Sequence, residues 1–503
     1  MDNKTEFGVA DYCAFVGMLI ISSAIGFYVS YKGNKSPEEF LVGDRSMKPF
    51  PVSMSLITSF VSAISLLGLS GETYANGMQI ITYTLGVPLA IIFSSHFVVP
   101  VLYPLKLISI NEYIELRFKS KRLRLVMFLV TEIFILAFSS ICLYSSTIAL
   151  SSVTNLSTLS NIFILGVGGI KAVIWTDVFQ FTVMMIGMIT ILAVGCAQVG
   201  GFIETLHIAS GGGRLEIFNM NPSPFVRHTF INTIPCGFFY FLQMYSVDQV
   251  NTQRICAVNS TKNAKRVLNY NIYGLLLVYF LTFSCGLVAY ASYVGCDPMA
   301  LGIITKKDQI MTYFVTDKLS FIPGLPGLFV ATIIGGTMST VSSYINGCMA
   351  QLWKDVCLKF KFFKDASIPL VIGFVLIALA ILASNSSSIL EMTITVSGTI
   401  YGPILGVFLI GFFLPNCNLK GVWTGFIGSS AFMLWLTIGA LLYKKPTKML
   451  SFSAAECVGL NSSSLNVSNI HEIISPFNGT MKESISDTSS INSLYQISYT
   501  LYI

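Results

Sequence analysis

The chain has 503 residues, of which 53% are hydrophobic and only 11% are charged, and its mean hydropathy is +0.72. Soluble globular proteins carry roughly a quarter charged residues, so this composition excludes them and predicts an all-α polytopic membrane protein in a lipid bilayer. The net charge of +6 comes largely from Lys and Arg in short loops between apolar runs, a pattern that sets membrane topology and does not indicate nucleic-acid binding.

Twelve apolar runs, each bounded by Pro, Gly, Asn or charged residues, predict membrane spans. In chain order they are 10–31, 50–71, 79–103, 125–150, 157–167, 172–198, 230–247, 268–294, 324–351, 367–384, 388–413 and 420–443. Residues 157–167 are too few to cross a core about 30 Å thick as a regular helix at about 1.5 Å per residue. Lys and Arg favour the cytoplasm, and their excess in the inside loops, where Arg254 is counted, is sharper if the chain still crosses there. We therefore expect twelve crossings with both ends outside.

Glycosylation acceptors fit this orientation, because they must lie on the lumenal side. Asn461, Asn466 and Asn478 are candidates in the polar segment 444–503, which we expect to be external. Most of the eleven cysteines lie in apolar runs, where they act as small apolar residues. Cys296 and Cys457 fall in the predicted external loops, so a disulfide between them is a further expectation.

Motifs of enzymes and primary pumps do not occur in the sequence. There is no GxxxxGK[ST] phosphate loop, no HExxH and no GxSxG, and the four histidines are isolated from one another. The sequence therefore predicts a transporter driven by an existing gradient. We expect no enzymatic activity and no cofactor apart from a coupling ion.

Span 324–351 carries the most informative polar cluster, with five hydroxyls between Thr337 and Ser343. Neutral oxygens from hydroxyls and freed backbone carbonyls are the ligands that a dehydrated Na⁺ requires at membrane depth. The alternative is that each hydroxyl bonds to the carbonyl four residues earlier in its own helix. Span 50–71 is also rich in hydroxyls, which either add ligands or allow close helix packing.

Two further features point to function. Span 230–247 has the clearest helix interruption, with Pro235 and Gly237 near its start. Four carboxylates lie in or beside spans, namely Glu132, Asp177, Asp248 and Glu391. Asp177 is deep enough to line a transport path, whereas the other three would reach an interface or pair locally.

These pieces together resemble the sodium/solute symporter family from Phe40 to Pro415. The most specific motifs are Gly168–Asp177, Gln249–Arg254, Gly336–Ser343 and Gly402–Gly406. The resemblance implies a LeuT-type fold, in which two inverted five-helix repeats are joined by extra helices. The implied regions are 1–49 (extra span and cytoplasmic loop), 50–198 (first repeat, fifth span shortened), 199–229 (external loop), 230–413 (second repeat), 414–443 (additional span) and 444–503 (external segment).

The resemblance also implies a sodium site between the second and ninth spans. Its ligands would be side-chain oxygens of Ser339 and Thr340, the carbonyls of Thr58 and Val61, and a carbonyl near Gly336. Asp177 matches the family's aspartate beside the cytoplasmic exit path. The solute would bind at mid-membrane between the two repeats.

Gly68–Gly77 looks most like the branch of the family that carries monocarboxylates, vitamins such as biotin and pantothenate, and iodide. Sugar carriers have a His at the position of Ser65 and a Tyr-Trp pair at Met244 and Tyr245, and iodide carriers tend to have Gln at the Ser65 position. We therefore expect Na⁺-coupled uptake of a small organic anion across the plasma membrane by alternating access. The alternatives are iodide or another solute, an uncoupled sodium leak or sensor, and an inactive truncated isoform.

The chain departs from the family pattern in three places. The fifth helix is shortened by about a dozen residues, the loop at 360–366 is short, and the chain ends at Ile503 before the family's final helix. A truncated gene model or a splice product would explain all three.

Overall fold

The computed structural model describes residues 7–31, 45–153, 170–223, 226–357, 367–384, 388–442 and 449–457. Within these ranges the chain is helical, and extended pairing is limited to a bridge between Met47 and Val258. Eight of the described helices are long and apolar enough to cross a membrane, and a bent pair makes a ninth span if it is counted as one. The all-α, multi-pass architecture predicted from composition is thus confirmed.

The helices of the first half are α1 (Val9–Tyr31), α3 (Pro49–Phe60), η2 (Ile64–Leu69), α4 (Ser70–Asn76), η3 (Met78–Leu85), α5 (Gly86–Phe93), η4 (Ser94–Val98), α6 (Val99–Leu105), α7 (Glu112–Phe118), α8 (Lys121–Val153), α10 (Ile170–Val199) and α11 (Phe202–Gly211). Those of the second half are α12 (Phe230–Ser246), α13 (Gln249–Cys256), α14 (Thr261–Ala291), η5 (Lys307–Gln309), α15 (Ile310–Lys318), α16 (Leu325–Leu352), η6 (Trp353–Cys357), α18 (Ser367–Ala383), α19 (Ile389–Phe413) and α20 (Leu419–Leu442). The segments from η3 to α6 form one span-length helical run.

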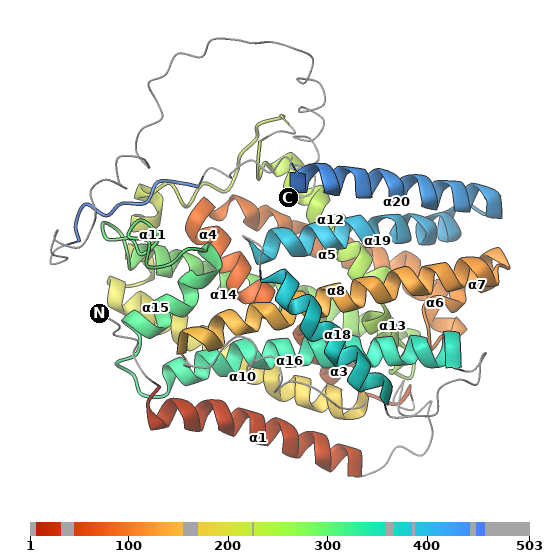
Figure 1. Ribbon diagram of the computed structural model, residues 1–503, viewed down its shortest axis with the longest axis horizontal. Coiled ribbons are helices and arrows are strands. Elements are labelled where there is room, and N and C mark those ends of the chain that lie inside the picture. The colour runs from red at the N-terminus through yellow and green to blue at the C-terminus, as the bar shows by residue number, and fades with distance from the viewer. Residues whose placement is uncertain are drawn as a thin grey trace.

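Helix α16 lies at the centre of the bundle. Most of the long helices run along the long axis of the molecule, with α1 and α20 at opposite edges (Figure 1). The most apolar stretch of α16 is 78% buried, whereas those of α1 and α20 are 11% and 17% buried. A helix that buries its whole circumference belongs to the core, and apolar helices left uncovered suit contact with lipid. The hydroxyl-rich segment of α16 is therefore held at the core.

The second predicted span is broken near its middle. Helix α3 ends at Phe60, Val61 is extended (φ −97°, ψ 97°), and η2 begins at Ile64, with a bend of 59° between the two halves. The Ser62 hydroxyl accepts the Ile64 N–H at 3.2 Å, which offers the backbone an alternative to the helical bond. The break lies at Val61, a residue whose carbonyl the resemblance to the symporter family implies as a sodium ligand.

The interruption expected in span 230–247 lies elsewhere than predicted. Helix α12 continues through Pro235 and Gly237 and ends at Ser246, and α13 then begins at Gln249. Asp248 caps α13 by accepting the N–H of Val250 at 2.8 Å. Pro235 is the sixth residue of α12 and lies inside the helix. It removes the backbone bond that its N–H would have made, but it did not mark the break.

The outer strap, Met449–Cys457, identifies one end of the molecule as the outside. Cys457 forms a disulfide with Cys296, which confirms that expectation, and disulfides persist in oxidising compartments. The strap donates the Leu450 N–H to Ala75 of α4 at 3.0 Å, and Phe452 stacks on Tyr74 at 5.1 Å. The strap thereby holds the end of the broken span.

Several sequence-based expectations fall outside the described residues. These are the shortened fifth span at 157–167, the loop at 360–366, and the glycosylation candidates Asn461, Asn466 and Asn478. The boundaries of the two repeats stay predictions as well.

Candidate functional site

A buried cluster of hydroxyls and charges lies where α3, α10, α13 and α16 meet. We call this cluster the polar junction; its members are Ser55, Ser59, Asp177, Arg254, Ser339 and Ser343. All six side chains are at most 1% exposed. Helices α3, α10 and α16 pack directly on one another, which brings residues from both predicted repeats into one site.

Asp177 is the acceptor at the centre of the polar junction. One of its carboxylate oxygens accepts the Ser339 hydroxyl at 2.6 Å, and the other accepts the Ser55 hydroxyl at 2.5 Å. Arg254 donates to that second oxygen at 3.1 Å. A buried carboxylate is tolerated only when charges and hydrogen bonds compensate it, and here both are supplied by distant segments of the chain.

Arg254, on α13, connects Asp177 to hydroxyls of α3 and α16. Its guanidinium donates to the hydroxyls of Ser59 at 2.7 Å and Ser343 at 2.6 Å, and these two hydroxyls lie 2.8 Å apart. Arg254 lies between two predicted spans, where it counts among the basic residues of the inside loops, but it is not an exposed loop residue. The residue is buried on α13, and its charge serves the ion pair with Asp177.

The five residues of the predicted sodium site lie together beside this junction. A Cβ placed on Gly336 would lie 3.2 Å from the Val61 carbonyl oxygen, so the broken span and α16 approach at backbone distance. The Thr58 hydroxyl lies 3.4 Å from the Asp177 carbonyl, and Ser339 bonds to the Asp177 carboxylate. The structure thus brings the predicted ligands into one buried place.

The alternative role for the hydroxyls is realised at both threonines of the predicted sodium site. Thr340 donates to the Gly336 carbonyl at 3.0 Å, and Thr58 donates to the Met54 carbonyl at 2.8 Å. Both are bonds to the residue four positions earlier, which satisfy a buried hydroxyl without a ligand. Ser339 is different, because its hydroxyl points away from its own helix to α10.

The predicted solute residues lie around the two helix breaks and do not form one open cavity. Ser65 is partly exposed and contacts the phenol of Tyr279. Met244 is buried, and Tyr245 directs its hydroxyl to Asn271 at 2.9 Å. Gln243 of α12 hydrogen bonds to Ser397 of α19. Ser397 was not among the residues predicted from the sequence.

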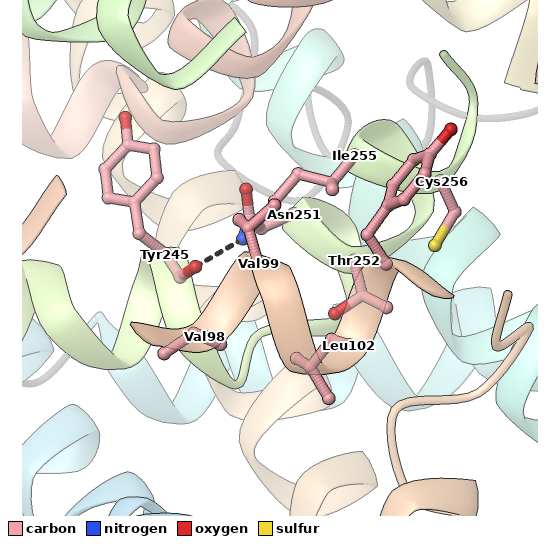
Figure 2. Close-up of a pocket in the computed structure, with 9 residues that line it drawn as sticks. Val98, Val99, Leu102, Tyr245, Asn251, Thr252, Ile255 and Cys256 are labelled. Carbon is pink, nitrogen blue, oxygen red and sulfur yellow. Dashed lines mark hydrogen bonds between the residues drawn. The ribbon is translucent and has the colours of Figure 1, made fainter. Parts of the chain in front are cut away.

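A small cavity beside the break after α12 is shown in Figure 2. It is lined by nine residues of η4, α6, α12 and α13, namely Val98, Val99, Leu102, Tyr103, Tyr245, Asn251, Thr252, Ile255 and Cys256. Its volume of about 10 Å³ is near the minimum for one water molecule. Asn251 donates to the Tyr245 carbonyl at 2.6 Å across it, as does Ser94 at 2.5 Å. The side chains of Asn251 and Ser94 thus satisfy a carbonyl at the end of α12. The cavity itself is too small for an organic anion.

The other carboxylates singled out in the sequence have local partners. Asp248 caps α13 and accepts the Tyr401 hydroxyl at 3.3 Å. Glu132 lies beside Cys348 of α16. Glu391 pairs with Arg227 at the outer end of α19. One carboxylate was missed, since Glu72 is fully buried in α4 but was not recognised as a membrane carboxylate.

Comparison with known proteins extends these observations. The model of the sodium:solute symporter family matches residues 40–428. Sodium-coupled monocarboxylate transporter 2 of Mus musculus is 34% identical over 477 residues, which are 91% of this chain and 77% of that protein. The sodium/iodide cotransporter of Homo sapiens is 36% identical over 528 residues, covering 99% and 81%.

One solved structure is similar along most of the chain. It is a Na⁺-coupled sialic acid symporter in a substrate-bound outward-open state, with a TM-score of 0.70 and 22% sequence identity over 89% of this chain and 100% of that one. At this level of identity the likeness concerns the fold. It confirms the LeuT-type architecture.

Proposed function

The chain belongs to the sodium:solute symporter family, and from that premise we propose that it moves a small organic anion together with Na⁺ across the plasma membrane. The chain is a sodium-coupled solute symporter and not an enzyme. The proposal concerns its cargo, its sodium ligands and its membrane.

The polar junction is the observation that supports the sodium ligands. Ser339 presents an uncharged oxygen to the buried Asp177 carboxylate, and the Val61 carbonyl lies against Gly336, three residues earlier on the same helix. Uncharged oxygens beside a single carboxylate suit a monovalent cation, whereas several carboxylates would favour a divalent one. Because the ligands come from both predicted repeats, sodium bound there stabilises one relative position of the repeats, and this links ion binding to alternating access.

The uncharged side chains at the helix breaks support an anionic cargo. Ser65 follows the first break, Gln243 is near the end of α12, and Ser397 lies within α19. Their hydroxyl and amide groups can donate to a carboxylate once the bond between Gln243 and Ser397 is exchanged for the cargo. The negative charge of the cargo is then balanced by the sodium bound nearby, so each ligand raises the affinity for the other. The monocarboxylate transporters among the relatives make a short monocarboxylate the first choice.

Uptake by cells that express the chain tests this proposal. Labelled lactate, biotin, iodide and glucose are offered separately in sodium buffer and in choline buffer, with untransfected cells as background. We expect sodium-dependent accumulation of the monocarboxylate and none of glucose. Accumulation that is equal in both buffers would exclude coupled transport, and sodium current without any uptake would identify a leak.

Iodide is the second candidate cargo. The human sodium/iodide cotransporter is as similar to this chain as the monocarboxylate transporters are. The position of Ser65 separates the two, since iodide carriers tend to have Gln there. Iodide uptake that exceeds monocarboxylate uptake in the same cells would replace our first choice.

A further inference from the structure

A second charge cluster lies at the outer end of the molecule. We call it the outer charge cluster; its members are Glu72, Arg227, His228, Lys307 and Glu391. Glu72 is 0% exposed and contacts Lys307 Nζ at 2.5 Å, Arg227 at 2.8 Å and His228 Nε2 at 2.8 Å. Glu391 joins from the start of α19, 3.0 Å from Arg227 and 3.6 Å from Lys307.

The cluster joins parts of the molecule that alternating access must separate. Glu72 belongs to the first predicted repeat, Lys307 and Glu391 belong to the second, and Arg227 ends the loop that links them. The disulfide-bonded loop that contains Cys296 leads into η5, which places Lys307 on the outer side. The start of α19 cannot move away from α4 on the outer side while Glu391 keeps its pairs with Arg227 and Lys307, whereas the pair of Lys307 with Glu72 does not have to break.

Close backbone packing seals the same contact. A Cβ on Gly71 would lie 2.7 Å from the Lys307 carbonyl oxygen, and one on Gly68 would lie 3.2 Å from the Cβ of Leu390. The outer half of the broken span therefore touches η5 and the first turn of α19 without intervening side chains. Separation of α19 from this surface is the movement that would open the outer side.

The pairs within the cluster are unequal. The side chains of Arg227 and Glu391 are 20% and 15% exposed, so water can replace their contact, whereas Glu72 has no exposed surface. When Glu391 leaves, Arg227 and Lys307 both keep Glu72 as a partner, so no buried charge is stranded. Removing Glu72 instead would leave two cations and a histidine without their shared acceptor.

We propose that Glu391, paired with Arg227 and Lys307, is an external latch that holds the outer side closed and releases before Na⁺ and cargo reach the site from outside. This inference rests on the alternating access of the proposed function and does not depend on the identity of the cargo. Glu72 is the fixed half of the latch, and Glu391 is the half that moves. Both are positioning residues for the transport cycle.

Hydrogen exchange of the purified chain in nanodiscs tests the latch without any cargo. Glu391→Gln should speed exchange at the first turns of α19 and at α4 by roughly two- to fivefold, the factor expected for losing a partly exposed ion pair. The matched control is Asp317→Asn, which removes a carboxylate from an exposed pair with Lys318 on the same side. If both variants exchange there at the wild-type rate, the latch is overturned.

A reversible cross-link tests the movement itself. Because the built Cβ of Gly68 lies 3.2 Å from that of Leu390, a small relaxation brings the pair Gly68→Cys and Leu390→Cys into disulfide range. We expect oxidation of the double variant to abolish sodium-dependent uptake and to slow exchange at α19, with both restored by a reducing agent. The single variants and the wild type receive the same oxidising and reducing treatments. They show how far those treatments change uptake and exchange by acting on the native disulfide between Cys296 and Cys457.

The two readouts separate the latch from the cargo assignment. If uptake is found for none of the proposed solutes but exchange at α19 still depends on Glu391 and on the cross-link, the latch stands and the cargo proposal fails. Uptake that continues unchanged in the oxidised double variant would show that the contact does not open, and would overturn the latch.

Discussion

The polar junction and the outer charge cluster both hold a fully buried carboxylate, but they surround it differently. Asp177 has one basic partner and neutral hydroxyls from two helices. Glu72 has two basic partners and a histidine, with a second carboxylate at the rim. The first arrangement supplies neutral oxygens for a monovalent cation, and the second supplies spare positive charge that lets a carboxylate leave.

This difference teaches how charge is used in a membrane protein that must change shape. An ion pair with one partner on each side cannot open in a dry environment without stranding both charges. The outer cluster avoids this penalty by sharing its cations between Glu72 and Glu391. The polar junction has no second carboxylate among its six members, so its opening requires water or another cation in place of Arg254.

The largest expected effect is at Arg254. Arg254→Met leaves Asp177 without its basic partner and should lower the free energy of unfolding by about 3–5 kcal/mol. Thermal unfolding of the detergent-solubilised chain measures the loss, with Arg266→Met on the exposed face of α14 as control. Addition of Asp177→Asn should recover most of the stability. Equal stability of the two arginine variants would show that the junction does not depend on its ion pair.

The next effect is a pH dependence at Asp308, which lies next to Lys307 of the outer charge cluster. Burial raises the pKa of Asp308 to about 6, although Ile389 N–H and Lys307 oppose the shift; the charges of Glu72 and Glu391 reinforce it. The folded protein therefore binds more protons than the unfolded chain between about pH 4 and 6, and this carboxyl makes folding less favourable as pH rises through that window. Two pKa units correspond to about 3 kcal/mol.

The variant Asp308→Asn should remove this pH dependence. It should keep the local structure, because an amide oxygen still accepts the Ile389 N–H. We expect the variant to be more stable than the wild type at pH 7, with the difference vanishing near pH 4. Unfolding temperatures across this range measure it, and Asp317→Asn is the control. A stability difference that grows as the pH falls would have the wrong sign for a carboxyl whose pKa is raised by burial.

A third effect concerns the seal between α4 and η5. Gly71→Ala places a methyl group 2.7 Å from the Lys307 carbonyl oxygen, and the resulting shift should cost about 1–3 kcal/mol. Gly425→Ala on α20, where the added Cβ has no neighbour within 4 Å, should be neutral or slightly stabilising. Thermal unfolding compares the pair. If Gly71→Ala lowers the unfolding temperature no more than Gly425→Ala does, the contact between α4 and η5 is less tightly packed than the backbone distances indicate.

The smallest effect in free energy is at the proposed sodium ligand. Ser339→Ala removes one hydroxyl from the polar junction and should raise the sodium concentration for half-maximal uptake about tenfold, the factor given by about 1.4 kcal/mol. Ser342→Ala on the same helix is the matched control, because its hydroxyl bonds to the Ser339 carbonyl. Identical sodium dependence of the two variants would exclude Ser339 as a ligand.

The sequence predicted most helices and the hydroxyls of α16, because composition and spacing carry both. The residue pattern did not locate the break of the second span, since no proline marks Val61. At the break the Val61 carbonyl approaches Gly336 of α16, a residue far away in the sequence. Arg254 and Glu72 were misjudged or missed for a related reason. Each is compensated by partners far away in the chain, and no local pattern reveals such a partner.

The outer strap also has a consequence for biosynthesis. Cys457 follows Cys296 by 161 residues, so at roughly 5–20 residues per second the earlier thiol waits about 10–30 s before its partner has been translated. During that interval the end of α4 lacks its hydrogen bond from Leu450 and its stacking on Phe452. The broken span is synthesised early, but its outer end gains these contacts only after the last described segment has been made.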